Sequence, residues 1–196
     1  MNAMDDEARS VLDFWFGAPD ASDYGQPREA WFRKDDAFDA AIRMRFAALV
    51  ERAIAGALAH WQRTPLEALA EIVVLDQFPR NAWRGTPRAF AGDRRALAAA
   101  RALVAGGGDR TLLAVHRQFA YLPFEHAEDR AMQAESMRLF RGLAADHPEH
   151  ADLIEWADKH RVIVERFGRF PHRNLVLGRA STAEEVEFLK QPGSGF

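Results

Sequence analysis

The chain has 196 residues, 48% of them hydrophobic, and a formal net charge of −3 at pH 7. A chain of this length buries about 70% of its unfolded surface, so we expect residues 1–196 to form one domain. The slight net acidity gives no global attraction to polyanions, and we expect no nucleic-acid partner. The absence of cysteine excludes disulfides and thiolate metal clusters, and it fits a cytoplasmic protein.

The N-terminal stretch from Met1 to Glu7 is acidic, whereas a secretory signal peptide is basic and then apolar. No run in the sequence approaches the ~18 uncharged residues that a membrane-spanning helix requires. We therefore expect a soluble protein with no membrane partner.

Helical periodicity starts near the N-terminus. The pattern predicts a first helix from Asp5 to Phe16, ended by Gly17. A long second helix, capped by Asp35 or Asp36, is expected to continue as far as about His60.

The third helix has the clearest start in the sequence. Thr64-Pro-Leu-Glu67 combines an N-cap threonine, a first-turn proline and a glutamate at the third position, which together make a capping box. Because a proline disfavours α geometry in the residue before it, Pro79 predicts that this helix ends near Phe78.

Further helices follow in the C-terminal half. The spacing of apolar residues predicts helices over residues 93–105, 109–121, 128–143 and 151–167. Pro123 is expected to end the second of these, and the fourth is expected to bury Trp156. Ser181 and Thr182 offer overlapping capping boxes for a short last helix.

Strand signals are weak throughout, because no alternating apolar run is bounded by hairpin turns. The sequence therefore predicts an all-α fold with about eight helices in antiparallel pairs.

Several blocks of the sequence, in order, resemble those of one bacterial family. The blocks are Val11-Leu-Asp-Phe-Trp-Phe-Gly17, Leu75-Asp-Gln-Phe-Pro-Arg-Asn81, Arg84-Gly-Thr-Pro-Arg-Ala-Phe90, Tyr121-Leu-Pro-Phe-Glu-His126, Arg166-Phe-Gly-Arg-Phe-Pro-His-Arg-Asn174 and Leu177-Gly-Arg179. They look like the signature of the family called domain of unknown function 924. The resemblance implies a tetratricopeptide-like fold, either superhelical or an orthogonal bundle, and it implies no activity. The ~34-residue tetratricopeptide period is not visible.

Two basic segments stand out in this acidic protein. Neither residues 77–92 nor residues 166–182 contain a carboxylate, although both contain several arginines. Arginine presents a planar set of donors that suits carboxylate and phosphate groups. These segments are therefore candidates for binding an anionic ligand. The alternative is a structural set of ion pairs with the chain's own acids, such as Asp76, Glu125, Glu128 and Asp129.

Histidines and carboxylates add candidates for acid–base chemistry. Glu125 and His126 precede the helix expected from residue 128, where carboxylates also suit the helix dipole. Burial and neighbouring charges can tune such groups toward neutrality, so both are candidate general acids or bases. His172 lies in the second basic segment and is the third candidate, whereas His160 lies on an apolar stripe and is interpreted as a core residue.

We hypothesise that the turns after Phe78 and Phe170 meet the segment 124–129 in one polar pocket. Its predicted ligand-binding residues are Arg80, Asn81, Glu125, His126, Arg169, His172, Arg173 and Asn174.

Three functions fit this pocket. The first is a helical binding or interaction protein for a small anionic or mixed-charge ligand, or for a protein or peptide. The second is a metal-independent enzyme with Glu125 or His126 as general acid or base. The third is a purely structural arrangement of arginines and carboxylates without a ligand.

Metal and cofactor chemistry have no support in the sequence. A His-Glu-x-x-His pair is absent, and Gly106-Gly-Gly108 lacks the lysine and the preceding strand of a phosphate loop. We expect no metal site and no cofactor, and the sequence leaves both the ligand and the oligomeric state open.

Overall fold

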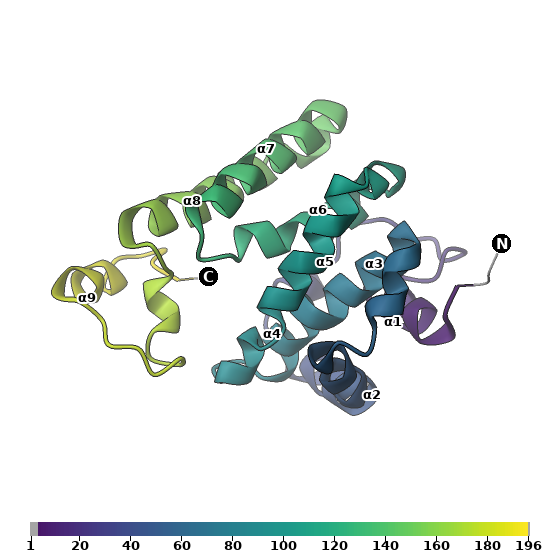
Figure 1. Cartoon of the computed structure of the whole chain (residues 1–196), viewed down its shortest axis with the longest axis horizontal. Coiled ribbons are helices and arrows are strands. Elements are labelled where there is room, and N and C mark those ends of the chain that lie inside the picture. The colour runs from purple at the N-terminus through teal and green to yellow at the C-terminus, as the bar shows by residue number, and fades with distance from the viewer. Residues whose placement is uncertain (1–3, 196) are drawn as a thin grey trace. The chain divides into compact units, whose positions relative to one another are not determined.

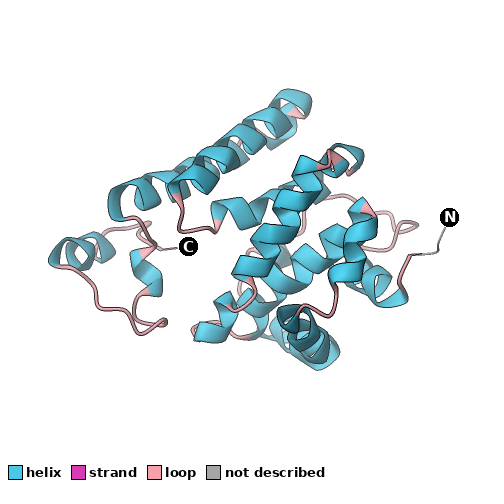
Figure 2. Ribbon diagram, in the orientation of Figure 1, coloured by secondary structure: helices cyan, strands magenta, loops and turns pink. Residues whose placement is uncertain are grey.

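The computed structural model describes residues 4–195 and is built from helices and connecting turns (Figure 1). Within those residues there is no β-strand (Figure 2), so the predicted all-α fold is confirmed. The chain divides into two compact units. Unit 1 contains the residues up to Arg84 together with Arg88–Pro123, and unit 2 contains Gly85–Pro87 and the residues from Phe124 onward. The tetratricopeptide-like arrangement stays a prediction.

Unit 1 contains the N-terminal helices. They are α1 (Asp6–Phe16), α2 (Asp36–Ala55), α3 (Pro65–Ile72), a π-helical turn (Val73–Gln77), α4 (Phe78–Ala82), α5 (Asp93–Ala105) and most of α6 (Ala114–Glu125). Because α3, the π-helical turn and α4 follow one another without a break, they count as one helix. The described residues then hold about eight helices in total, as expected from the periodicity.

Local capping signals predicted the starts of α1 and α3 correctly. Asp5 accepts hydrogen bonds from the backbone N–H groups of Glu7 and Ala8 at the start of α1. Thr64 accepts one from the N–H of Glu67 at the start of α3. The predicted end of α2 near His60 is wrong, because Gly56 adopts a left-handed conformation with φ of 86° and ends the helix at Ala55.

The predicted helix end at Phe78 is also wrong. The helix continues through Pro79 because the preceding turn is π-helical, and the N–H of Phe78 bonds to the carbonyl of Val73, five residues earlier. A π-helical turn changes the hydrogen-bond register, so the missing N–H of a proline in the next turn is tolerated.

The helix predicted over residues 109–121 is displaced along the chain. It begins at Ala114, because Leu112 is extended and separates a short 3₁₀ turn, Gly108–Thr111, from α6. Asp109 does not cap it, since its carboxylate accepts a hydrogen bond of 2.6 Å from the Tyr121 hydroxyl. The helix then continues through Pro123 to Glu125.

Aromatic side chains form the core of unit 1 around Trp15. The ring centroid of Trp15 lies 6.2 Å from that of Trp31, 5.7 Å from Phe78 and 5.5 Å from Phe119. All four side chains are buried, and the indole N–H of Trp31 donates to the carbonyl of Trp15 at 2.9 Å. Apolar burial thus packs α1 against α4 and α6, and the Trp31 indole ties the 3₁₀ turn Glu29–Trp31 to the end of α1.

Unit 2 is built on an antiparallel helix pair, α7 (Arg130–Asp146) and α8 (Leu153–Phe167), which lie side by side in Figure 1. A 3₁₀ turn, Pro171–Arg173, and the short helix α9 (Ala183–Leu189) follow. The predicted capping box at α9 is confirmed, because Thr182 and Glu185 each accept the other's backbone N–H.

The prediction that Trp156 is buried is wrong. Its side chain is 49% exposed, and the Lys159 ammonium lies 4.1 Å from its ring centroid. Ile163 and Val164 provide the core-facing side of α8 and pack with Phe170. Trp156 lies at the edge of this stripe, where a cation over its ring takes the place of apolar burial.

Within the described residues, no helix combines the length and apolarity needed to cross a membrane.

Candidate functional site

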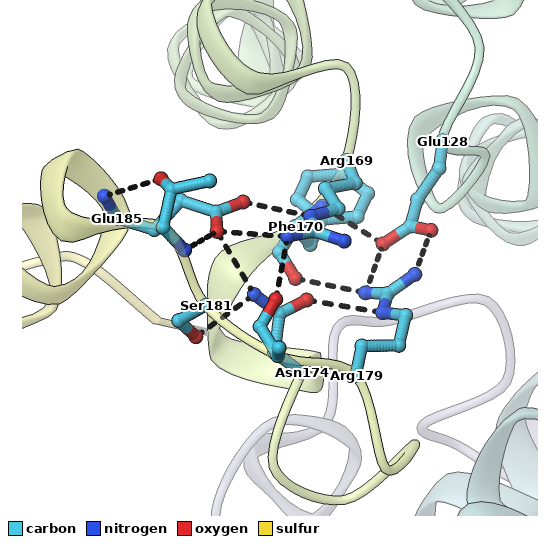
Figure 3. A network of polar contacts seen from close by, with 9 residues as sticks. Glu128, Arg169, Phe170, Asn174, Arg179, Ser181 and Glu185 are labelled. Atoms are coloured by element: carbon cyan, nitrogen blue, oxygen red, sulfur yellow. Dashed lines mark hydrogen bonds and ion pairs between the residues drawn. The ribbon is translucent and has the colours of Figure 1, made fainter.

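Two arginine–carboxylate pairs hold the segment between α8 and α9 (Figure 3). Arg169 donates two hydrogen bonds of 2.7 and 2.8 Å to the carboxylate of Glu185. Arg179 does the same to Glu128, at 2.5 and 2.8 Å. Each guanidinium therefore binds its carboxylate through two parallel N–H groups, which is a strong and directional arrangement.

Asn174 connects these two pairs (Figure 3). Its amide nitrogen donates to Ser181 at 3.0 Å and to Glu185 at 3.3 Å. Its amide oxygen accepts a hydrogen bond of 3.0 Å from Arg179. Asn174 is 1% exposed, so its hydrogen-bonding groups are used inside the protein.

The arginine partners lower the pKa values of both carboxylates, Glu185 and Glu128. Hydrogen bonding by Arg169 lowers the pKa of Glu185 to about 2. Burial alone would raise the pKa of Glu128, but the Arg179 guanidinium and the N–H of Phe170 outweigh burial and lower it. Both acids are therefore ionised at neutral pH, and the charges of Arg169 and Arg179 are matched by them.

Arg173 is held differently from the other two arginines. It is buried, its Nη1 donates to the backbone carbonyl of His126 at 3.0 Å, and its guanidinium lies 4.4 Å from the ring centroid of Phe170. Its described contacts thus include a carbonyl and an aromatic face, and its positive charge affects the neighbouring histidines.

Glu125, His126 and His160 form what we call the imidazole–carboxylate cluster. One potential ligand atom from each residue lies within 4.8 Å of those of the other two. Glu125 comes from the last turn of α6, His126 follows it, and His160 lies in the middle of α8. Gln133 of α7 fixes the end of α6 by donating to the carbonyls of Glu125 and Ala127 at 2.7 and 2.8 Å.

The contacts of His160 define its tautomer. Its Nδ1 lies 2.9 Å from the carbonyl oxygen of Trp156 and 3.1 Å from Oε1 of Glu125. A carbonyl can only accept, so Nδ1 carries the proton and the neutral ring has its lone pair on Nε2. Burial, together with the charges of His126 and Arg173, lowers the pKa of His160 to about 3. His160 is therefore neutral at pH 7.

His172 is a second neutral imidazole in unit 2. Its ring centroid lies 5.7 Å from that of Phe170, which in turn lies 5.6 Å from His160. Burial and the charge of Arg173 lower the pKa of His172 to about 4, although Glu128 opposes this shift. Two neutral rings and one guanidinium thus surround the same phenylalanine.

The cluster contains the two histidines and one carboxylate that zinc commonly uses in catalytic sites. The sequence predicted no metal site because the usual short spacing is absent, but the fold brings the donors together from α6 and α8. Arg173 disfavours a cation here, since its charge already lowers the affinity of His160 for a proton. The donor set can hold a divalent ion only if the nearby carboxylates offset this charge.

Sequence reasoning interpreted His160 as a core residue and missed its place in this cluster. Its position on an apolar stripe is correct, but the stripe brings it to Glu125, 35 residues away. A periodic pattern shows which face of a helix is buried and does not show what that face meets.

Arg80 and Asn81 belong to unit 1 and have partners there. Arg80 donates to the Asp93 carboxylate at 2.7 and 3.0 Å and lies 3.2 Å from Asp76. Asn81 donates to Asp39 at 3.0 Å. Six of the eight predicted ligand-binding residues lie in unit 2 and these two in unit 1, so the single pocket that joins all eight stays a prediction.

The structure thus defines an all-α protein with a cluster of two histidines and one glutamate. Residues 11–193 match the model of the family described as bacterial protein of unknown function (DUF924), and the chain belongs to this family. It is also similar to the solved structure of the protein of unknown function ATU0120 from Agrobacterium tumefaciens, with 38% identity and a TM-score of 0.82. That match covers 94% of this chain and 97% of the other. No curated protein is significantly similar.

Proposed function

We propose that the protein binds a small anionic or mixed-charge molecule at the imidazole–carboxylate cluster of unit 2, with His172 and Arg173 as additional contacts. The observation that carries this proposal is the convergence of neutral His160 and buried Glu125 with His126, beside the charge of Arg173. Neutral imidazoles donate and accept hydrogen bonds, Glu125 accepts them, and Arg173 favours a negative group.

The proposal assigns Arg169, Arg179 and Asn174 a positioning role instead of ligand contact. Their donors are used by Glu185, Glu128 and Ser181, and this holds the 3₁₀ turn that carries His172 and Arg173. Of the predicted ligand-binding residues in unit 2, those expected to touch the ligand are therefore Glu125, His126, His172 and Arg173.

A thermal-shift screen tests this function with a panel of carboxylated, phosphorylated and zwitterionic metabolites. A ligand at a hundredfold excess over its Kd should stabilise the protein by roughly 3 kcal/mol. The shift should disappear in His126→Ala and His160→Ala. His150→Ala is the matched control, because this histidine lies in the turn between α7 and α8, away from the cluster residues in sequence. If no panel member raises the Tm, the arrangement of arginines and carboxylates is only structural.

A second candidate function is metal-independent acid–base catalysis on the same ligand. The contact of 3.1 Å between Glu125 and His160 favours it, because a carboxylate oriented by an imidazole is suited to proton transfer. Glu125→Gln should then keep ligand binding and abolish turnover of a ligand found in the screen. Equal product formation by wild type and variant rules this candidate out. We retain a cytoplasmic location as part of the proposal.

A further inference from the structure

His116 in α6 is a buried histidine of unit 1. It is 2% exposed, and among the described residues neither of its ring nitrogens has a hydrogen-bond partner. Its ring instead packs edge-on against Phe16, with centroids 4.5 Å apart, and against Tyr24, at 5.8 Å. Burial lowers the pKa of His116 to about 4, so the ring is neutral and offers one donor and one acceptor.

A buried polar group without a partner costs stability, and native proteins rarely keep one without a reason. A phenylalanine would fill the same aromatic environment without this cost. The contrast with His160 is direct, since His160 is also buried but is satisfied by the carbonyl of Trp156. His116 therefore has hydrogen-bonding capacity that the described fold does not use.

A cavity of about 440 Å³ that is open to solvent adjoins His116. This volume lies in the range of small-molecule sites, which are mostly apolar with a few polar groups. Apolar side chains from the start of α3 and from the segment before α6 line it, and among them are Pro65, Leu66, Leu112 and Leu113. None of the described lining residues carries a formal charge at neutral pH, so the cavity does not favour a charged ligand.

The two threonines of this cavity are already engaged. The Thr64 hydroxyl donates to the Glu67 carboxylate at 2.8 Å while capping α3. The Thr111 hydroxyl donates to the carbonyl of Gly108 at 2.8 Å. His116 is therefore the lining group best able to orient a ligand.

We propose that this cavity binds a small, uncharged, mainly apolar molecule that carries one hydroxyl group, with the hydroxyl hydrogen-bonded to a ring nitrogen of His116. A single aromatic or aliphatic ring fits the volume, and the leucines contact its apolar part. Both nitrogens lie beneath the surface, so binding includes a small displacement of a neighbour. Tyr24, a partly exposed residue of the loop after α1, is the aromatic neighbour placed to move.

Phenol and toluene are matched probes, because they have nearly the same shape and differ in one hydroxyl. Titration of the full chain, followed by NMR of ¹⁵N-labelled histidine, should show phenol binding about tenfold more tightly than toluene, with the His116 ring signals shifted. Benzoate, which adds a charge, should bind more weakly than phenol. In His116→Phe, which keeps the aromatic packing, phenol and toluene should bind equally.

Leu113→Trp is a second variant, and it leaves the buried core unchanged. Leu113 is 46% exposed, so a larger side chain there should leave folding intact and obstruct the cavity, which weakens both probes. His150→Phe should bind both probes as the wild type does. The proposal is overturned if phenol does not bind, if it binds no more tightly than toluene, or if its preference survives in His116→Phe. Phenol and toluene are uncharged and the site lies in unit 1, so failure here leaves the proposed function of unit 2 unaffected.

Discussion

Each unit contains a short stretch of nearly the same sequence, Phe78-Pro-Arg-Asn81 in unit 1 and Phe170-Pro-His-Arg-Asn174 in unit 2. The two stretches fold differently. In unit 1 the stretch is α4, reached through a π-helical turn without a break. In unit 2 Gly168, with φ of 72°, ends α8, and the stretch becomes a 3₁₀ turn. A glycine before the Phe-Pro pair allows the chain to leave the helix, and without that glycine the helix continues through the proline.

The two stretches also differ in the ion pairs that the arginines in and beside them form. Arg80 pairs with Asp76, one turn earlier on the same continuous helix, and with Asp93 at the start of α5. Arg169 and Arg179 instead bind carboxylates 16 and 51 residues away. The helical version of the stretch, α4 in unit 1, is thus stabilised in part by a neighbour in sequence. The loop version, between α8 and α9 in unit 2, depends on tertiary contacts. Each version can be disrupted separately.

The largest effect is expected in unit 1. Arg80→Ala removes the guanidinium that lies 3.2 Å from the carboxylate of Asp76, which is 0% exposed, and removing one side of a buried pair costs roughly 3–5 kcal/mol. Urea denaturation should show this loss. The double variant Arg80→Ala with Asp76→Asn also removes the carboxylate charge of this pair and should recover part of the loss. A loss below about 1 kcal/mol would contradict the buried pairing.

A smaller effect is expected in the loop of unit 2. Arg179→Ala removes the contacts to Glu128, Asn174 and the Phe170 carbonyl from a partly exposed site, and we expect a loss of about 2 kcal/mol. Arg166→Ala is the matched control, because Arg166 and Glu184 have side chains 50% and 62% exposed. The control should lose less than about 1 kcal/mol in the same denaturation experiment. Equal losses would show that the loop pair is no stronger than a surface ion pair.

The loop version should also depend on pH. The pKa of Glu185 falls from 4.5 to about 2 beside Arg169, so this carboxylate contributes stability that is complete above pH 4.5. That contribution is lost as the pH falls from 4.5 toward 2, because in this range the unfolded state takes up a proton and the folded state does not. Denaturation of wild type and Glu185→Gln across pH 2–6 measures it. The two stability curves should converge on acidification, and parallel curves would exclude the linkage.

The smallest effect tests the glycine that separates the two versions. Gly168→Ala should cost about 1 kcal/mol, because a side chain at positive φ is strained even though the added carbon meets no neighbour. Gly142 lies inside α7 with equally open space, so Gly142→Ala should stabilise by roughly 0.5–1 kcal/mol. Opposite signs in thermal unfolding would confirm that backbone conformation, not space, decides the result.

The local rules of the sequence found most helix starts, because capping by Asp5, Thr64 and Thr182 depends on neighbours within three residues. They failed at Pro79 and Pro123, since the hydrogen-bond register that tolerates a proline depends on the packing of the whole helix. Periodicity, capping residues and prolines do not indicate a π-helical turn.

The candidate site was predictable in part. Charge placement located the loop that carries Arg169 and His172, and it named Glu128 among the acids that arginines could meet. Pairing of Glu185 with Arg169 and of His160 with Glu125 follows from helix packing, which spacing along the chain does not reveal.

Glu185 contributes to two processes that are separate in most proteins. Its carboxylate completes the capping box that begins α9 and also receives both hydrogen bonds from Arg169. Nucleation of this seven-residue helix, which is too short to persist alone, is thereby coupled to closure of the loop. The C-terminal segment should consequently order in a single cooperative step, and hydrogen exchange in α9 should rise together with exchange in the loop when Arg169 is removed.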